Sequence, residues 1–146
     1  MSGSAPGPVL VLASASAARA AMLAAAGVPA ETQPARIDEA AVKAALLAES
    51  AQPRDIADKL AELKALRVSA RRPGRLVLGA DQVLVRRGRL YDKPGDRAAA
   101  RAQLAELRGG THELLSAAVV ARDAQPLWRH VGSARLTMRP FTDRFL

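Results

Sequence analysis

The sequence predicts an α/β domain in which a mixed, twisted sheet is flanked by helices. Short apolar runs that are typical of buried strands alternate with Ala- and Leu-rich segments that favour helices. The 146 residues suit one domain, and 49% of them are hydrophobic, which is enough for a sizeable core. Only 3% are aromatic, so the core must be built mainly from Leu, Val and Ala.

The first predicted unit is a strand over residues 9–13 followed by a helix over residues 17–26, with Gly27 as its C-cap. Ser14 lies in the turn between them. A Ser-containing turn at a helix N-terminus is typical of an anion site, because free N–H groups and the helix dipole point at it. Arg19, one turn into the helix, can reach the same place. An ordinary Ser N-cap beside an exposed Arg explains the same pattern, and both interpretations stay open.

Two helices are predicted next. Asp38 can cap a helix that runs to about Glu49, and Pro53 suits the first turn of the following one. The second helix carries an inner apolar stripe: Ile56, Leu60 and Leu63. Lys64 borders this stripe, where a Lys usually directs its ammonium to solvent, although an ammonium that faces a ligand is the alternative. Glu39 likewise suits an ordinary solvated acid of a first helical turn.

The central predicted strand carries the first candidate functional residue. Apolar runs at residues 76–80 and 83–85 enclose Asp81, and together they indicate a strand buried on both faces. The pair Arg87 and Gly88 then suits a hairpin turn. An unpaired carboxylate in a dry strand costs several kcal/mol or takes up a proton. A cation, either a metal ion or a Lys or Arg side chain, must therefore face Asp81.

The rest of the chain alternates in the same way. A loop is predicted over residues 67–75, and residues 93–96 form a turn that caps a helix ending near Leu107. The last predicted segments are two strands and the start of a further helix: residues 111–122, 127–139 and 141–146.

Charge and composition limit the classes of function. The net charge is +8, with six basic and seven acidic residues before Arg67 but sixteen basic and seven acidic from there on. This imbalance is typical of a polyanionic partner, but solvated arginines explain it equally well. The absence of cysteine excludes disulfides and thiolate metal sites and permits the cytoplasmic location that we expect. No run approaches the roughly 18 apolar residues of a membrane span, and the first eight residues, which carry no basic side chain, are expected to form a polar arm.

Familiar catalytic templates are missing, and this narrows the chemistry. Neither standard phosphate-binding glycine motif occurs, no nucleophile elbow is found, and His112 and His130 are too few and too far apart for a His-rich metal site. A set of hard-oxygen and cationic side chains remains: Ser14, Arg19, Glu39, Lys64, Asp81 and Lys93. Carboxylates suit Mg²⁺ or Mn²⁺, and Lys and Arg suit phosphate oxygens, so this set is typical of a nucleotide phosphate site.

Six sequence blocks, in order and approximate spacing, resemble those of the Maf family. They are LASASAAR (12–19), IDE (37–39), LAELKA (60–65), GADQV (79–83), KP (93–94) and LRGGTH (107–112). Each block alone is weak, but together they span nearly the whole chain. The resemblance implies an elongated α/β fold with two lobes and a central cleft, related to inosine-triphosphate pyrophosphatases.

The resemblance also implies an activity. Maf-like enzymes hydrolyse non-standard or modified nucleoside triphosphates between the α and β phosphates, a house-cleaning reaction that releases monophosphate and diphosphate. By position, Asp81 would be the general base or a metal-linked activator of water, and Glu39 would help Asp81 to hold a Mg²⁺ or Mn²⁺ cofactor. The remaining set would bind the triphosphate: Ser14, Arg19, Lys64 and Lys93.

Three departures from the family pattern bear on specificity and completeness. Ala18 stands where the family usually has a second Arg, and Gln82 is found in the branch that resembles 7-methyl-GTP pyrophosphatases, whereas the dTTP/UTP branch has Thr. We expect these two positions to influence the choice of base. Family members continue for a few dozen residues beyond the match to Leu146, so residues 1–146 are expected to form a single Maf-like domain that is incomplete at its C-terminus.

Two other classes of function compete with the enzyme. A nucleic-acid-binding module would use the basic second half: Arg71, Arg72, Arg75, Arg86, Arg87 and Arg89. With one Trp, one Tyr and two Phe there is little to stack bases on, so nucleic acid is not the expected partner. The family has also been linked with septum formation, which suggests a non-catalytic regulator. We expect a nucleoside triphosphate as ligand and no membrane partner, and a homodimer stays open.

Overall fold

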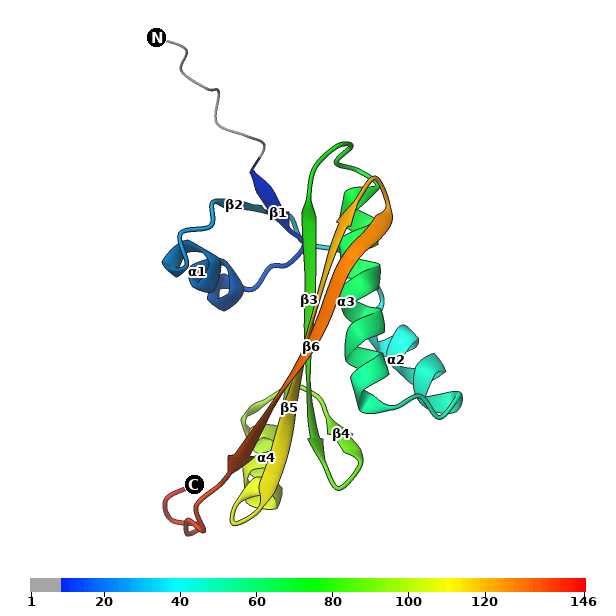
Figure 1. Ribbon diagram of the computed structural model, residues 1–146. Helices are drawn as coiled ribbons and strands as arrows, with labels where there is room; N and C mark the ends of the chain where they lie inside the picture. Colours follow the sequence, from blue (N-terminus) through cyan, green and yellow to red (C-terminus); the bar gives the residue numbers. More distant parts are fainter. Residues whose placement is uncertain (1–8) are drawn as a thin grey trace.

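The computed structural model describes residues 9–146 (Figure 1), and the polar arm expected over residues 1–8 lies outside them. Strands and helices alternate in the order β1-α1-β2-α2-α3-β3-β4-α4-β5-β6. The strands are β1 (Leu10–Leu12), β2 (Ala30–Thr32), β3 (Val77–Arg86), β4 (Arg89–Tyr91), β5 (Thr111–Arg122) and β6 (Gln125–Thr137). The helices are α1 (Ala17–Ala25), α2 (Glu39–Ala48), α3 (Pro53–Ser69) and α4 (Arg97–Leu107).

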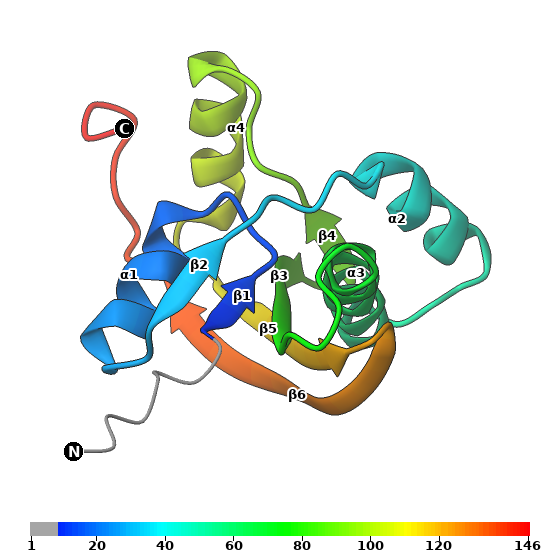
Figure 2. The same ribbon diagram turned by 90° about the horizontal axis from the view of Figure 1, so that it is seen from above.

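All the described strands belong to one mixed sheet, which confirms the predicted α/β class. The sheet order is β2-β1-β3-β5-β6, and β4 pairs with the end of β3. β1 is parallel to both of its neighbours, whereas β3, β5 and β6 are antiparallel to one another. These three form the long twisted ribbon of Figure 1, and Figure 2 shows α1 and α3 on either side of β1 and β3.

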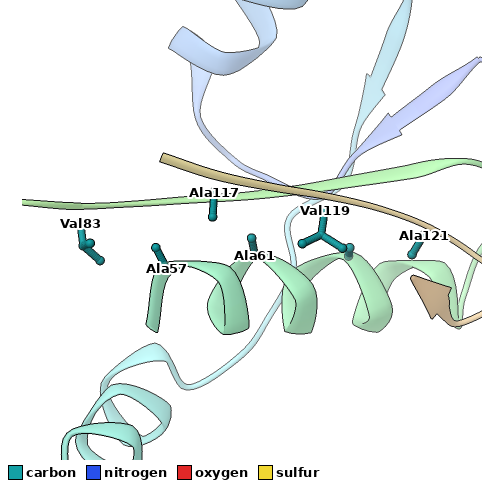
Figure 3. Close-up of a cluster of buried hydrophobic side chains, with 7 residues drawn as sticks. Ala57, Ala61, Val83, Ala117, Val119 and Ala121 are labelled. Carbon is teal, nitrogen blue, oxygen red and sulfur yellow. The ribbon is translucent and has the colours of Figure 1, made fainter. Parts of the chain in front are cut away.

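Small side chains bring α3 very close to the sheet. Ala57 and Ala61 pack against Val83 of β3 and Ala117 of β5 (Figure 3), and all four are buried. At Gly79 of β3, an added Cβ would collide with the carbonyl oxygen of Ala61. Only Gly fits where a helix backbone lies this close to a strand. The core is therefore made mainly of Ala and Val, as the low aromatic content predicts.

The burial of β3 differs from the prediction. Its side chains alternate, so that Val77, Gly79, Asp81 and Val83 are buried while Gln82 is exposed. Successive side chains of a strand point to opposite faces, and α3 covers one of these faces. The expectation of a strand buried on both faces is therefore wrong.

Local end signals predicted most helix boundaries. Ser16, Asp38 and Asp96 cap α1, α2 and α4, each accepting a backbone N–H from three residues further along the chain. The hairpin between β3 and β4 turns at Arg87 and Gly88, with φ values of 50° and 76°. Positive φ at both turn residues is the geometry that suits a two-residue hairpin.

Three predictions of secondary structure need correction. The strand β2 was not expected, because three residues are too short for a visible apolar period. The loop predicted over residues 67–75 starts too early, since α3 continues to Ser69, and both Val68 and Ser69 are buried. Residues 141–146 form a hydrogen-bonded turn at Thr142 and not the start of a helix. Among residues 9–146, no helix has both the length and the apolar character needed to cross a membrane.

Candidate active site

The centre of the site is a buried ammonium between two carboxylates. Lys64 Nζ of α3 lies 2.9 Å from Asp81 Oδ1 on β3 and 2.6 Å from Glu39 Oε1 at the start of α2. It also lies 3.4 Å from the carbonyl oxygen of Ala80. The contacts with Asp81 and Ala80 are hydrogen bonds donated by the ammonium, and the contact with Glu39 is an ion pair. The side chain of Lys64 is only 10% exposed, which contradicts the solvent-directed alternative.

The sequence explains why these groups meet. Gly79 lets α3 approach at Ala61, and Lys64 follows Ala61 by three residues, on the same side of the helix. Asp81 follows Gly79 by two residues and therefore points to the same face of the sheet. The close contact between helix and strand thus places the ammonium beside the carboxylate. Lys64 is the cation that Asp81 was predicted to need.

Burial controls the protonation of Asp81. Loss of solvent raises the pKa of its carboxyl group above the ordinary value, and the negative charge of Glu39 adds to this. The hydrogen bond from Lys64 and its positive charge, together with the charge of Arg19, act to lower the pKa but do not cancel the effect of burial. Asp81 therefore takes up a proton at a higher pH than a solvated aspartate does.

Ser14 and Arg19 form the second part of the site. Ser14 is buried, and its Oγ accepts hydrogen bonds from Ser16 N at 3.0 Å and from Arg19 Nη1 at 3.3 Å. Ser16 and not Ser14 is the N-cap of α1, so the capping interpretation applies to Ser16. The anion site at Ser14 and Arg19 stays a prediction. Because Arg19 also lowers the pKa of Asp81, its guanidinium acts on the same site.

The topology explains how the two parts come together. β1 pairs in parallel with β3, with Leu12 opposite Leu78, and Ala13 N donates to Leu78 O. Ser14 thus follows β1 next to the segment of β3 that leads into Asp81. After β1 the chain continues to β2, which pairs with one edge of β1. It then returns to β3, which pairs with the other edge of β1. In open α/β sheets, such a reversal at the carboxyl ends of parallel strands is the usual place for a ligand.

The remaining predicted residues lie outside this cluster of contacts. Lys93 is exposed in the segment after β4, and it makes no hydrogen bond or ion pair with the other described residues. Gln82 is exposed on the opposite face of β3 from Asp81, where its Nε2 donates to Ser116 Oγ at 3.0 Å. Ala18 is exposed in the first turn of α1. The structure therefore brings together five of the six chemically active candidates.

The two carboxylates are compatible with a divalent cation in the presence of substrate. Glu39 and Asp81 both aim an oxygen at one point, which Lys64 Nζ occupies. Residues 9–146 contain no group of three or more acidic or His side chains arranged to hold a metal ion. Mg²⁺ commonly binds through one or two carboxylates and completes its shell with substrate phosphates and water, so two protein ligands suit it.

A shallow hollow of about 550 Å³ lies between α2 and α3. Its lining residues are Arg36, Ile37, Asp38, Val42, Leu63, Leu66 and Arg67. None of the candidate site residues lines it, so this hollow is not the central cleft implied by the resemblance. That cleft stays a prediction.

One contact near the site was not predicted from the sequence. Lys43 Nζ of α2 lies 2.6 Å from Asp92 Oδ1. Asp92 is the residue immediately before Lys93. A weak signal was available, because Lys43 lies one helical turn after Glu39 and on the same face of α2. The partner 49 residues further along the chain could not be identified from spacing alone.

Known proteins resemble this chain over most of its length. The chain is 58% identical over 137 residues to a nucleoside triphosphate pyrophosphatase of Caulobacter vibrioides, covering 94% of this chain and 68% of that protein. It is 49% identical to a 7-methyl-GTP pyrophosphatase of Mesorhizobium japonicum, covering 94% and 69%. A solved nucleoside-triphosphatase (dITP/XTP pyrophosphatase) of Mycobacterium abscessus is 18% identical, with a TM-score of 0.44 over 86% of this chain and 70% of that one.

The family comparison covers the whole described chain. The family model for Maf-like proteins matches residues 9–146, from the first residue before β1 to the end. This range includes both parts of the site, the Ser14–Arg19 pair and the two carboxylates around Lys64. The chain therefore belongs to the Maf family.

Proposed function

We propose that this chain is a nucleoside triphosphate pyrophosphatase. The observation that carries the proposal is the buried Lys64 between Asp81 and Glu39, beside the Ser14–Arg19 pair that follows β1. Cations and a serine hydroxyl suit phosphate oxygens, and carboxylates suit water activation. The relatives from Caulobacter vibrioides and Mesorhizobium japonicum are named for the same class of reaction.

In the proposed reaction, Asp81 acts as the general base. It takes a proton from a water molecule, whose oxygen forms a bond to the α phosphorus. The bond between the α phosphorus and the α–β bridging oxygen breaks, and diphosphate leaves with the electron pair. Asp81 Oδ2 receives no hydrogen bond from the described residues, which leaves one oxygen of the carboxylate available as acceptor. A raised pKa makes Asp81 a stronger base than a solvated aspartate.

Positive charge supplies most of the remaining catalysis. Phosphoryl chemistry depends mainly on positioning and on neutralising the charge of the phosphates. Arg19, Lys64 and Lys93 would bind the triphosphate together with Ser14. Glu39 and Asp81 would hold Mg²⁺ or Mn²⁺, which would neutralise phosphate charge and make bound water more acidic.

The preferred base depends on Gln82 and Ala18 in this proposal. Both are exposed, and Gln82 lies on the opposite face of β3 from Asp81. Gln82 stands where the 7-methyl-GTP branch carries the same residue, so a modified purine nucleotide is the first substrate to test. The same proposal gives the enzyme a house-cleaning role in the cytoplasm, where it would remove non-standard nucleotides.

The test is diphosphate release from a panel of 7-methyl-GTP, GTP, dTTP and UTP with Mg²⁺ or Mn²⁺. Diphosphate and the nucleoside monophosphate are expected in equal amounts, and Asp81→Asn is the matched control with the same shape and no charge. Release of inorganic phosphate as the first product would place the cleavage at the γ phosphate and contradict the proposal. Equal rates in the wild type and Asp81→Asn would remove Asp81 from the mechanism.

The nucleic-acid alternative loses support from the placement of the arginines. The six arginines of the predicted basic surface lie in two groups, one before β3 and one at its C-terminal end. Ten residues of strand separate them by roughly 30 Å. Arg72 and Arg75 are also paired with Glu31. They therefore do not form one continuous basic surface. No contact favours the septum-linked regulator, which the panel assay also tests.

A further inference from the structure

One ion pair connects α2 to the segment that joins β4 to α4, next to the proposed site. Lys43 Nζ of α2 and Asp92 Oδ1 lie 2.6 Å apart, with side chains that are 23% and 73% exposed. From α4, Gln103 Nε2 donates to the backbone carbonyl of the same Asp92 at 2.8 Å. The segment of residues 92–96, which joins β4 to α4, is thus held from both helices at one residue.

This ion pair lies beside the chemical centre. β4 runs antiparallel to β3 with Tyr91 opposite Leu84, so the chain after Tyr91 continues alongside β3 in the direction of Asp81. Figures 1 and 2 both show β4 and α2 on the same side of the molecule. On α2, Lys43 follows by one turn the Glu39 that pairs with Lys64. The same helix therefore contacts the buried ammonium and, one turn later, the residue next to Lys93.

Few other contacts fix these elements. No residue of α2 is buried, and Leu107 is the one buried residue of α4. Elements with little apolar burial open locally at low cost, so specific polar contacts decide where they lie. Lys93 itself makes no hydrogen bond or ion pair with other described residues, so its position depends on its neighbours.

We propose that the Lys43–Asp92 ion pair positions Lys93 for the triphosphate. We call this pair the clasp. It holds the segment of residues 92–96 against α2 and thereby sets the reach of the Lys93 ammonium towards phosphates bound near Asp81 and Lys64. Lys43 and Asp92 are positioning residues that act through Lys93 and do not touch the substrate. The inference rests on the proposed function, since Lys93 needs a triphosphate to bind.

The kinetic test uses the variants Lys43→Met and Asp92→Asn and the charge exchange Lys43→Asp/Asp92→Lys. Exposed ion pairs contribute modestly, so each single variant is expected to raise KM for the triphosphate by about two- to fivefold. The kcat should change by less than about twofold, because the groups that meet the reacting atoms stay in place. The charge exchange should restore KM towards the wild-type value. The control is Glu106→Gln, which removes the 3.4 Å ion pair between Arg89 and α4 and should leave KM unchanged.

A double-mutant cycle separates positioning from a general effect of charge. If the clasp acts through Lys93, adding Lys43→Met to Lys93→Ala should not raise KM further. A general loss of positive charge near the site would instead multiply the two effects. Multiplicative effects would overturn the proposal, as would a charge exchange that fails to rescue KM.

Hydrogen exchange provides a readout that needs no turnover. In the free protein, Lys43→Met should speed amide exchange in residues 92–96, whereas Glu106→Gln should not. The wild type could release no diphosphate from any triphosphate while exchange in residues 92–96 still rises in Lys43→Met. In that case the proposed function fails, and the clasp is a structural contact with no role in substrate binding. Unchanged exchange in Lys43→Met would overturn the clasp itself, whatever the activity.

Discussion

At position 81 a carboxylate lies on the buried face of β3, bound to a Lys and two residues beyond the Gly that admits α3. Replacing it by Asn keeps the shape and still offers an oxygen to Lys64, but it removes the base and a negative charge. Turnover is expected to fall by about a hundredfold or more, measured as diphosphate release at saturating substrate. The free energy of unfolding, measured in urea, should be unchanged or higher near neutral pH. A variant that is active but unstable would reverse both expectations.

The raised pKa of Asp81 also predicts two dependences on pH. The base must be ionised, so kcat/KM should fall on the acid side at a higher pH than an ordinary aspartate would give. Stability should move in the opposite direction. Because the folded state binds this proton more tightly than the unfolded state, the contribution of Asp81 is greatest below its unfolded pKa and is lost as pH rises through its folded pKa. Unfolding free energies of the wild type and Asp81→Asn should therefore converge as the pH is lowered through that range.

The two lysines of the proposed site should behave differently when truncated. Lys64→Ala leaves Asp81 buried without its partner, and such losses cost about 3–5 kcal/mol in unfolding free energy. Lys93→Ala removes an exposed side chain with no partner among the described residues, so stability should not change. It should weaken triphosphate binding more than monophosphate binding, as measured by calorimetry. Equal losses for the two ligands would argue against a contact between Lys93 and the β or γ phosphate.

At the scale of elements, the packing of α3 on β3 depends on one Gly. A Cβ at Gly79 would meet the Ala61 carbonyl and lie 2.7 Å from Ala65 N, and neither backbone atom can move without shifting α3. Gly79→Ala should therefore lower the unfolding free energy by about 3 kcal/mol or more, at or beyond the upper end of overpacking costs. Gly95→Ala is the matched control, since nothing lies within 4 Å of its added Cβ. Similar denaturation midpoints for the two variants would show that α3 can shift at little cost.

Signals within one helix or strand predicted its type and most of its ends. They did not predict contacts between elements that are distant in the sequence. Caps at Ser16, Asp38 and Asp96 are local, because donor and acceptor lie three residues apart. The need of Asp81 for a cation was also visible, since an apolar strand surrounds it. Which face of β3 would be covered was not visible, because that depends on how α3 packs. The partner of Lys43 was hidden for the same reason, since sequence spacing carries no information on contacts 49 residues apart.

At the scale of the whole molecule, folding pairs some of the acidic residues of the first part of the chain with basic residues of the second part. Glu31, from the acidic first part, pairs with Arg72 and Arg75 of the basic second part. Asp58 and Glu62 of α3 likewise pair with Arg129 of β6. These ion pairs join the two parts of the chain. They offer an explanation for the uneven distribution of charge, which the sequence alone also linked with a polyanionic partner. The net charge of +8 nevertheless stays on the folded protein.

That net charge predicts how association with a triphosphate depends on salt. A positive protein attracts a polyanionic substrate over distances of about 10 Å at 0.1 M ionic strength, and added salt screens this attraction. Raising the ionic strength from about 0.02 M to about 0.5 M should lower kcat/KM several-fold while kcat at saturation changes little. Arg71→Gln, in the loop before β3 and away from Asp81, should weaken this salt dependence slightly and leave kcat unchanged. A kcat/KM that is independent of salt would show that the charge has no part in binding substrate and that the arginines serve the fold alone.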